Sequence, residues 1–389
     1  MKLPKIIICI IAVVFFYSCS NSARNSLYKI PEVDIVDAFE KNKKTSLSKI
    51  VDGNVNYIEL ETNNSFIVGG FPRIYANEEI LSVISFKKIF RFNRKNGNFI
   101  SEIGHFGKDP GSYGATIFCN SYDESRNIYY ARGHKNHLFY CFDENGSLIN
   151  KINTPLQENG FYQYNDTTYL AYIKNFSGTE EKRLVFFNQN NPCFCWVKNY
   201  NLYANKDLNE GVLWRNHSWF YMHKTNVFFY ELFTDTIYKV KECSLLPEYK
   251  LNLGKYLMPY NESDKFDFIK NESENHFYIE NFFESDRYLF FHINFQNSYF
   301  QGVYDKKNKE TYISGLSGGF ENDIDNFIPF QFYSINNSGE LVGFQEAYIV
   351  KKWFDENPDK AAKLPPHLQK LRNIKESDNP VVMIVKLKD

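Results

Sequence analysis

Short apolar runs that alternate with polar turn residues recur along most of the chain. Each run ends in a turn rich in Asn, Asp, Gly or Pro and then resumes, which is the pattern of a β-hairpin because these residues accept the backbone angles of a tight turn. Five segments have this form: 88–104, 137–153, 183–198, 236–254 and 299–315. We expect each of them to be a two-stranded antiparallel hairpin.

A second pair of strands is predicted ahead of each hairpin and once more near the carboxyl terminus. The second strand of these pairs is expected to begin near Ile80, Asn127, Thr167, Val227, Arg287 and Glu340. Repeats of four antiparallel strands at the spacing of these starting positions are typical of a β-propeller. In this fold, neighbouring blades cover one another's faces. The sequence therefore predicts an all-β fold, a six-bladed β-propeller of four-stranded antiparallel blades.

The last repeat is one strand short. It ends at 380–389 after three predicted strands, whereas an unpaired strand at 55–62 precedes the first repeat. Because an open sheet edge exposes unpaired backbone groups, we expect the N-terminal strand to complete the last blade and close the ring. The long connection at 351–379 is predicted to form short helices that cap this blade. Its expected buried contacts are Trp353, Phe354, Leu364, Leu368 and Leu371.

The amino terminus combines Lys2 and Lys5 with an apolar run at 6–17 and then Cys19. This is the pattern of a signal peptide, and the run is too short to span a membrane as a helix. Cys19 is the candidate lipidation residue; an ordinary secretory signal with an incidental cysteine is the alternative. The predicted organisation has three parts: a lipoprotein signal peptide (1–18), a lipid-anchored tether and lead-in (19–54) and the propeller (55–389).

Charge and cysteine content narrow the expected partners. The net charge of −1 provides no broad basic field, so nucleic acid is not an expected partner.

Apart from Cys9 and Cys19, five cysteines remain, and this odd number leaves at least one thiol unpaired within a single chain. On a strand, Cys193 and Cys195 would share one face, so we interpret them as buried packing residues rather than as a metal or redox site.

A glycine-rich loop at 104–114 follows the first hairpin. No helix is predicted after it, which argues against a phosphate-binding loop, and we interpret it as the connection from the rim of one blade to the axis of the next. Such connections share a face with those between second and third strands, where ligand sites usually lie. The candidate ligand-binding residues at this axial mouth are His105, Lys108, Asp109, Arg132, His134, Lys135, Phe71, Tyr75 and Tyr333. A solvated polar rim is the alternative.

No metalloprotease helix or zinc spacing is present in the sequence, and we predict no catalytic residue, metal or cofactor. Three kinds of function are considered. The first is a monomeric binding or interaction module for a glycan, a peptide or an envelope protein. The second is a propeller hydrolase similar to the calcium-dependent lactonases, and the third is a structural envelope protein. The predicted inner strands are aromatic rather than rich in Asp, Glu and Asn, which favours the binding module.

The chain resembles the six-bladed β-propeller lipoproteins of gut Gram-negative bacteria, a largely uncharacterised family. Four segments carry the resemblance: YIELET (57–62), NGNFISEIGHFGKDPGSY (96–113), FTDTIYKVKECSLLPEYKLNLG (233–254) and DNPVVMIVKLK (378–388). In the glycine loop similar sequences usually read G-x-G-P-G-E-Y, and this chain departs from that pattern at 108–113. The resemblance implies the propeller fold and an envelope location rather than an activity.

The segment after Cys19 lacks the acidic cluster that marks export to the cell surface in some of these lipoproteins. We therefore expect an outer-membrane lipoprotein on the periplasmic side, held to the membrane by acyl chains on Cys19.

Overall fold

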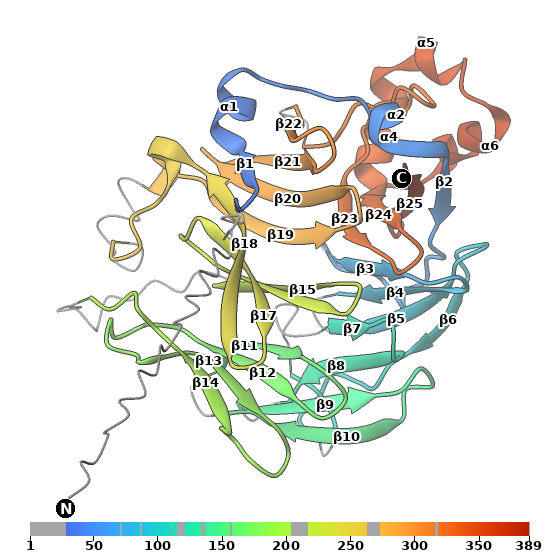
Figure 1. Ribbon diagram of the computed structural model, residues 1–389. Coiled ribbons are helices and arrows are strands. Elements are labelled where there is room, and N and C mark those ends of the chain that lie inside the picture. The colour runs from blue at the N-terminus through green and yellow to red at the C-terminus, as the bar shows by residue number, and fades with distance from the viewer. Residues whose placement is uncertain are drawn as a thin grey trace, which may run out of the picture.

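Six β-sheets arranged in a ring form the body of the computed structural model (Figure 1). Five sheets have four strands, and one has a fifth strand added from the N-terminal region. The structure describes residues 29–388 except for 71, 86–87, 110, 115–120, 134–136, 156–157, 204–216, 263–272 and 316–317. This arrangement is the predicted six-bladed β-propeller.

Each blade is numbered here in chain order, with its strands given from the first to the fourth. Blade 1 contains β3 (Arg73–Ala76), β4 (Ile80–Ile84), β5 (Ile89–Asn93) and β6 (Phe99–Glu102). Blade 2 contains β7 (Ser121–Asp123), β8 (Ile128–Arg132), β9 (Leu138–Phe142) and β10 (Leu148–Asn153). Blade 3 contains β11 (Glu158–Gln163), β12 (Tyr169–Ile173), β13 (Lys182–Phe187) and β14 (Cys195–Lys198).

The remaining blades contain the second half of the chain and one N-terminal strand. Blade 4 contains β15 (Ser218–His223), β16 (Asn226–Glu231), β17 (Thr236–Lys241) and β18 (Ser244–Asn252). Blade 5 contains β19 (Tyr278–Glu284), β20 (Tyr288–Phe295), β21 (Ser298–Asp305) and β22 (Glu310–Ile313). Blade 6 contains β23 (Phe332–Ile335), β24 (Glu340–Gln345), β25 (Val381–Leu387) and β2 (Val51–Glu59). All five predicted hairpins are confirmed as third and fourth strands of blades 1–5.

The ring closes where the two ends of the chain meet. Strand β2 pairs antiparallel with β25, with Asn56 opposite Ile384 and Glu59 opposite Val381. The predicted closure is thus confirmed, although β2 begins at Val51 and carries a register irregularity between Asp52 and Asn56. The sequence indicated only the regular part of this strand, because the irregular start does not alternate between apolar and polar residues.

The lead-in before β2 folds against three blades. Strand β1 (Glu32–Asp34) adds to blade 4 in parallel with β18, and α1 (Ile35–Glu40) follows it directly. Phe39 then packs its ring edge-on against Phe277, Phe295 and Phe300, with ring centroids 5.0–5.4 Å apart. The chain continues through α2 (Leu47–Ile50) into blade 6. The sequence predicts only a lead-in here, since each of these elements is too short to give a periodic signal.

The apolar core is divided among the interfaces between blades. Six clusters of buried side chains are present, and each contains residues from two neighbouring blades. The second and third strands are buried on both faces; in β12, for example, every residue is buried. The fourth strands are more exposed, as in β10. Each blade therefore depends on both neighbours for its stability.

The predicted helical insertion lies between β24 and β25. Its elements are α4 (Ala347–Glu356), α5 (Pro358–Ala361), α6 (Pro366–Gln369) and the 3₁₀ helix η3 (Lys370–Asn373). Two further 3₁₀ helices, η1 (Gly254–Tyr256) and η2 (Ser273–Asn275), lie between blades 4 and 5. Of the five predicted contacts of the insertion, four are buried and Trp353 is partly buried, with its ring 4.6 Å from that of Phe327. The helical insertion and the core between blades 5 and 6 therefore form one apolar cluster.

The first strands line the axis, because β15 contacts β19, β19 contacts β23 and β23 contacts β3. Since the strands of a blade are antiparallel, its connections alternate between two faces of the ring. We call the face with the connections between blades and those between second and third strands the loop face. The opposite face, with the turns after first and third strands, is the turn face.

Truncation tests the closure. Removal of residues 20–30 should leave the melting temperature of the soluble protein unchanged, because this segment ends before β1. Removal of 20–50 should lower it, because β1, α1 and α2 are lost. Removal of 20–62 should abolish cooperative unfolding, because β25 then becomes an open edge. Thermal unfolding followed by circular dichroism distinguishes the three proteins, and equal transitions for the first and third would contradict closure by β2.

Candidate functional site

The glycine loop that connects blades 1 and 2 is held tightly against blade 2. Its Tyr113 is fully buried and pairs with Gly133, which follows β8. Gly104 has a φ of +56°, and a Cβ atom there would lie 2.8 Å from the ring of Phe142. Only glycine fits this position, for reasons of both backbone angle and space. The interpretation of 104–114 as a structural connection is therefore confirmed for its described residues.

The candidate polar residues of this glycine loop are exposed. Nε2 of His105 lies 2.6 Å from Oδ2 of Asp109, and Lys108 projects from the same loop. The guanidinium of Arg132 lies over the ring of Phe139 at 5.2 Å, so part of its side chain packs on its own blade. The structure thus brings His105 and Asp109 into direct contact and places the end of β8 beside their loop.

The candidate aromatic residues lie on neighbouring first strands. Tyr333 on β23 stacks on Phe344 at 4.4 Å and donates its hydroxyl to Gln331 at 2.9 Å, and burial raises the pKa of its hydroxyl. Tyr75 on β3 lies 5.9 Å from Tyr122. Three other candidates lie outside the described residues: Phe71, His134 and Lys135. Binding at the axial mouth stays a prediction.

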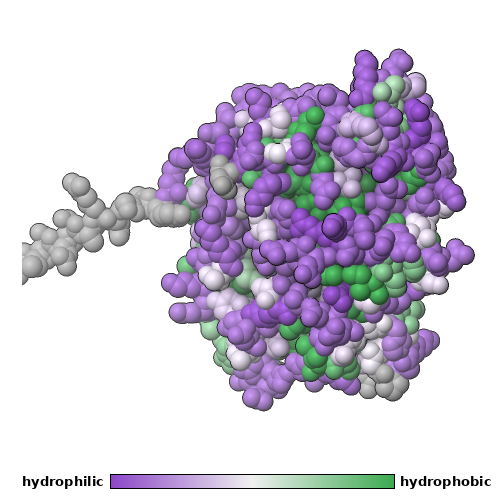
Figure 2. Space-filling view, turned by 90° about the vertical axis from the view of Figure 1, so that its right-hand side faces the viewer, coloured by the Kyte–Doolittle hydropathy of each residue, from purple (hydrophilic) through white to green (hydrophobic). Residues whose placement is uncertain are grey.

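Large apolar side chains are exposed more often on the loop face of the ring than on the turn face. Among the described residues, five exposed ones lie on loop-face connections: Ile67, Phe106, Tyr200, Leu202 and Tyr348. The other six lie on the fourth strands or directly before one: Ile100, Leu148, Ile149, Phe194, Trp196 and Leu246. Among the described turns of the turn face, only the one between β13 and β14 carries such a residue, Phe194. Figure 2 shows one side of the ring, where apolar areas are separated by polar surface.

An ionisable side chain, that of Glu124, lies at the axis on the turn face. The carboxylate oxygens of Glu124, in the turn after β7, accept hydrogen bonds from the Asn337 amide at 3.0 and 3.2 Å. Blades 2 and 6 are separated by blade 1, so this contact requires both turns to reach the axis. Burial raises the pKa of Glu124 to about 7, and the bond from Asn337 opposes this increase. The charge at this end of the axis therefore changes near neutral pH.

Buried acidic residues link neighbouring blades. Between blades 3 and 4, Glu231 is 1% exposed and accepts from Arg183 at 2.6 Å, from Tyr260 at 2.7 Å and from Tyr172 at 2.9 Å. All of its carboxylate bonds come from side chains distant in the sequence, so no local motif marks it. A carboxylate with these donors satisfies its buried charge, and loss of one donor would leave that charge poorly compensated.

A second carboxylate, Glu284, has the same role between blades 4 and 5. It accepts from Tyr249 at 2.6 Å, from Lys306 at 2.9 Å and from Tyr221 at 3.0 Å. Because the carboxylate of each network accepts all its hydrogen bonds from within the protein, we assign both a structural role.

Polar side chains are also buried below the loop face between blades 3 and 4. Lys174, Asn175 and Asn199 are at most 6% exposed. Burial, with the nearby charge of Lys174, lowers the pKa of His217 to about 3, so its imidazole is neutral. The neutral ring lies at the start of blade 4, where it adds no positive charge to the loop face.

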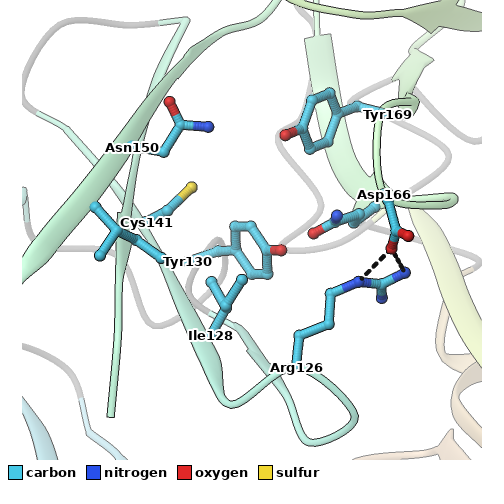
Figure 3. A pocket seen from close by; sticks show the side chains of 9 residues that line it. Arg126, Ile128, Tyr130, Cys141, Asn150, Asp166 and Tyr169 are labelled. Atoms are coloured by element: carbon cyan, nitrogen blue, oxygen red, sulfur yellow. Dashed lines mark hydrogen bonds and ion pairs between the residues drawn. The ribbon is translucent and has the colours of Figure 1, made fainter. Parts of the chain in front are cut away.

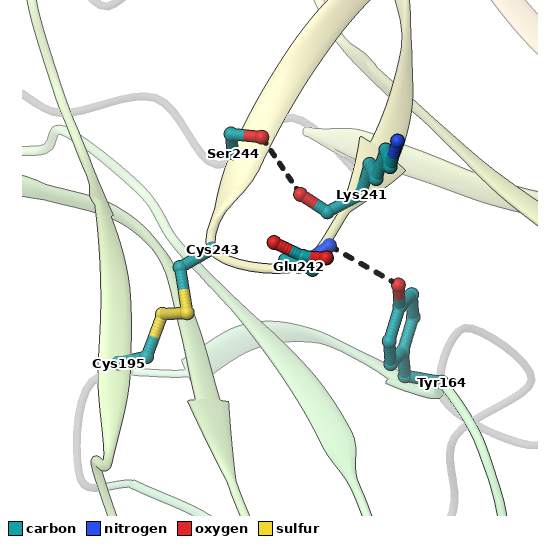
Figure 4. The surroundings of a disulfide bond; sticks show 6 residues. All are labelled: Tyr164, Cys195, Lys241, Glu242, Cys243 and Ser244. Atoms are coloured by element: carbon teal, nitrogen blue, oxygen red, sulfur yellow. Dashed lines mark hydrogen bonds between the residues drawn. A yellow bond between two sulfur atoms is a disulfide. The ribbon is translucent and has the colours of Figure 1, made fainter.

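A disulfide bond joins blades 3 and 4 (Figure 4). Cys195, the first residue of β14, is bonded to Cys243 in the turn between β17 and β18, with their Cα atoms 6.0 Å apart. The interpretation of Cys195 as a packing residue was therefore wrong. The two cysteines lie in predicted hairpins of successive repeats, which was the available signal, but their pairing depends on how the blades stack.

Cys193 also differs from the prediction that it shares a face with Cys195. It is a free thiol that packs against the cluster between blades 2 and 3, whereas Cys195 packs toward blade 4. Cys193 precedes β14, so the alternation of a regular strand does not apply to it.

Two described cavities lie away from the axial mouth. The first, about 190 Å³, is between blades 2 and 3 and is lined by the free thiol of Cys141 and by Tyr130 and Tyr169 (Figure 3). Arg126 and Asp166 form an ion pair at 2.8 Å on its side. Burial raises the pKa of Cys141 to about 12, so this thiol is not a nucleophile at neutral pH.

The second cavity, about 400 Å³, lies between the lead-in and blade 5. It is considered below. Among the described residues no three His, Cys, Asp or Glu side chains gather as a metal site would. No helix of that part of the chain has the length and apolar character needed to cross a membrane.

Comparison with known proteins identifies the family. The family model described as a domain of unknown function, DUF4934, matches residues 30–386. The chain belongs to the DUF4934 family. The matched segment begins just before β1 and ends in β25, so the family unit includes the lead-in as well as the closing strand pair. No curated protein matches the chain.

Two solved structures share the fold. A protein described as exported, from Bacteroides fragilis NCTC 9343, has a TM-score of 0.65 at 17% identity, with 92% of this chain and 100% of that chain covered. A member of the DUF4221 family from Bacteroides vulgatus ATCC 8482 has a TM-score of 0.51 at 10% identity, with 90% and 99% covered. At these identities the likeness extends to the fold alone.

The disulfide gives a testable stability difference. The Cys195→Ser, Cys243→Ser variant should unfold at a lower temperature than the wild type, because a crosslink across 48 residues restricts the unfolded chain by about 4 kcal/mol on a loop-entropy model. Reductant should lower the melting temperature of the wild type and leave that of the variant unchanged. Cys193→Ser is the matched control, and a reductant effect that persists in the double variant would contradict this bond.

Proposed function

We propose that this protein is an exported envelope lipoprotein whose propeller binds a peptide or protein partner on its loop face. The observation that carries the proposal is the uneven distribution of exposed apolar side chains. Five occur on described loop-face connections, and one, Phe194, occurs on a described turn of the opposite face. If these side chains were incidental, the two sets of connections would carry them in similar numbers.

The chemistry of the exposed set suits a protein surface. Three of its members are the aromatic residues Phe106, Tyr200 and Tyr348, which are 38%, 82% and 54% exposed. Aromatic side chains are enriched at protein interfaces, because they bury a large area at a small entropic cost. Removal of apolar surface from water contributes roughly 25 cal/mol per Å², so a partner that covers these rings gains affinity.

Charged groups stand beside these rings. Phe106 lies between His105 and Lys108, and Lys198 places its ammonium 5.4 Å from the ring centre of Tyr200. Polar groups around apolar anchors are typical of the rim of an interface, where they contribute to specificity more than to affinity. The loop that carries Phe106 is fixed by the buried ring of Tyr113, so this part of the surface is ordered before binding.

Three independent features support the proposed location. Cys19 after a signal-like run provides the lipid anchor, an interblade disulfide suits an oxidising compartment, and one structural relative is described as exported. We place the protein at the outer membrane on the periplasmic side, as a monomer. No observation on the described residues favours a hydrolase or a purely structural role, and neither is proposed.

The binding proposal is tested with matched triple variants of the soluble domain. The loop-face variant carries Phe106→Ala, Tyr200→Ala and Tyr348→Ala, and the control carries Ile100→Ala, Trp196→Ala and Leu246→Ala on fourth strands. Peptide and glycan arrays identify a ligand, and calorimetric titration measures its affinity. We expect the loop-face variant to bind the best peptide at least tenfold more weakly, about 1.4 kcal/mol, with an unchanged melting temperature.

Two results would overturn this proposal. One is equal loss of affinity in both triple variants, which would remove the distinction between the faces. The other is binding to glycans alone, which would exclude a peptide or protein partner.

The anchor is tested separately. Cys19→Ala should release the protein from the membrane fraction, because acyl chains on Cys19 are its proposed attachment. A fatty-acid analogue supplied to the cells should label the wild type and not the variant, and Cys9→Ala is the control that should retain both label and membrane association. An unlabelled wild type that still sediments with membranes would contradict lipidation.

A further inference from the structure

We propose that the cavity between the lead-in and blade 5 binds a small organic molecule through an oxyanion group, a carboxylate or a sulfate ester. This site is distinct from the loop face, because the blade residues that line the cavity include Arg287, in the turn after β19, and Asn308, in the turn after β21. Both turns belong to the turn face. The cavity of about 400 Å³ falls within the range of roughly 300–1,000 Å³ typical of small-molecule sites.

The outer wall of the cavity is the lead-in segment 43–50, which is fixed at both ends. The carbonyl of Lys43 accepts from the Ile313 amide at 2.9 Å, and the Leu47 amide donates to the Glu321 carbonyl at 2.9 Å. Leu47 is fully buried in the cluster between blades 5 and 6. The wall is therefore held by backbone bonds and apolar packing, so the cavity exists without a ligand.

The charges that line the cavity favour an anion. Lys44, Lys49 and Arg287 contribute three cations, and Asp305 is the only acidic residue among the lining residues. Neither Lys44 nor Lys49 forms an ion pair with another described residue. Two acidic residues flank the site and are themselves bonded: Glu310 accepts from Tyr312 at 2.5 Å, and Asp323 accepts from the Ser48 amide at 2.9 Å.

The one acidic lining residue is already compensated. Oδ2 of Asp305 accepts from Arg287 at 2.9 Å and from the side-chain amide of Asn308 at 3.0 Å. Oδ1 accepts from the backbone amides of Lys307 and Asn308 at 2.9 and 3.1 Å. Although burial acts to raise it, these bonds hold the pKa of Asp305 below its usual value. Asp305 thus neutralises Arg287, and the two lysines supply the excess positive charge.

A buried hydroxyl without a partner completes the site. Tyr288 lines the cavity and is 1% exposed, yet its hydroxyl has no hydrogen-bond partner among the described residues. Burial raises the pKa of Tyr288, so the group is a neutral donor. Buried polar groups are normally satisfied, and an oxyanion in the cavity would accept this proton as its hydrogen bond. Thr45, Ser46 and Asn308 supply further polar groups in the wall.

The smaller cavity between blades 2 and 3 lacks this combination. Its arginine, Arg126, bonds Asp123 at 2.7 Å and Asp166 at 2.8 Å, so its charge is compensated within the protein. No lysine lines that cavity. The excess of unpaired cations and the unsatisfied hydroxyl are specific to the cavity beside the lead-in.

The test uses the soluble protein with four probes: inorganic sulfate, glucuronate, N-acetylglucosamine 6-sulfate and neutral N-acetylglucosamine. We expect the anionic probes to raise the melting temperature of the wild type and the neutral sugar to leave it unchanged. Tyr288→Phe should weaken calorimetric binding of the anionic probes at least tenfold. The fold of this variant should persist, since it removes only a hydroxyl with no partner. Lys44→Gln with Lys49→Gln should weaken binding to a similar extent.

Tyr113→Phe is the matched control. Tyr113 is fully buried and its hydroxyl also has no hydrogen-bond partner among the described residues, but it lies in the loop between blades 1 and 2, outside this cavity. This variant should bind the probes as the wild type does. Tighter binding of a sugar anion than of sulfate would show that the sugar ring is recognised as well, which supports an organic ligand. Equal binding would assign recognition to the anion alone and would contradict an organic ligand.

Four outcomes would overturn the proposal: no stabilisation by any anionic probe, equal stabilisation by the neutral sugar, sulfate binding as tight as that of the sugar anions, or unchanged affinity in Tyr288→Phe. Because the loop-face triple variant leaves this cavity intact, it should retain anion binding. The experiments on the loop face and on this cavity therefore test the two proposals independently.

Discussion

The pairing of β2 with β25 is the constraint on which the rest of the structure depends. Each blade buries both faces of its middle strands only if a neighbour stands on either side, so the ring must close for any blade to be fully covered. Without β2, the last blade would present β25 as an open edge, and the cluster between blades 6 and 1 would lose Ile58 and Leu60. Closure turns six marginal sheets into one cooperative unit.

Hydrogen bonds and an ion pair between neighbouring blades supplement the apolar packing of the ring. Arg94 and Glu340 join blades 1 and 6 at 2.8 Å, Ser82 and Tyr129 join blades 1 and 2 at 2.7 Å, and Gln301 bonds the backbone of blade 6 from blade 5. Apolar packing alone tolerates sliding of one sheet over the next, whereas a hydrogen bond has a fixed length and direction. These links therefore set the stagger between blades and, with it, the positions of the loops that form the proposed binding face.

The sequence predicted what is periodic and local. The second strands begin within two residues of their expected positions, since apolar alternation and turn residues mark them directly. It did not predict β1, α1 or the Cys195–Cys243 bond, because these depend on contacts between distant segments. The candidate site divides in the same way. His105 and Asp109 are close in the sequence and meet, while Tyr288 and Lys44 form a cavity wall that only the folded chain brings together.

The order in which the chain is synthesised has a consequence for the closure. Because synthesis proceeds from the amino terminus, β2 emerges early and its partner β25 emerges last, so the contact between them is among the final ones to form. Contacts of such long range slow folding because they close the largest loop. Until β2 pairs with β25, the lead-in and the early blades remain partly covered sheets with exposed edges. Such intermediates are the species that chaperones bind and that proteases cut, so the rate of ring closure determines how long the chain is exposed to them.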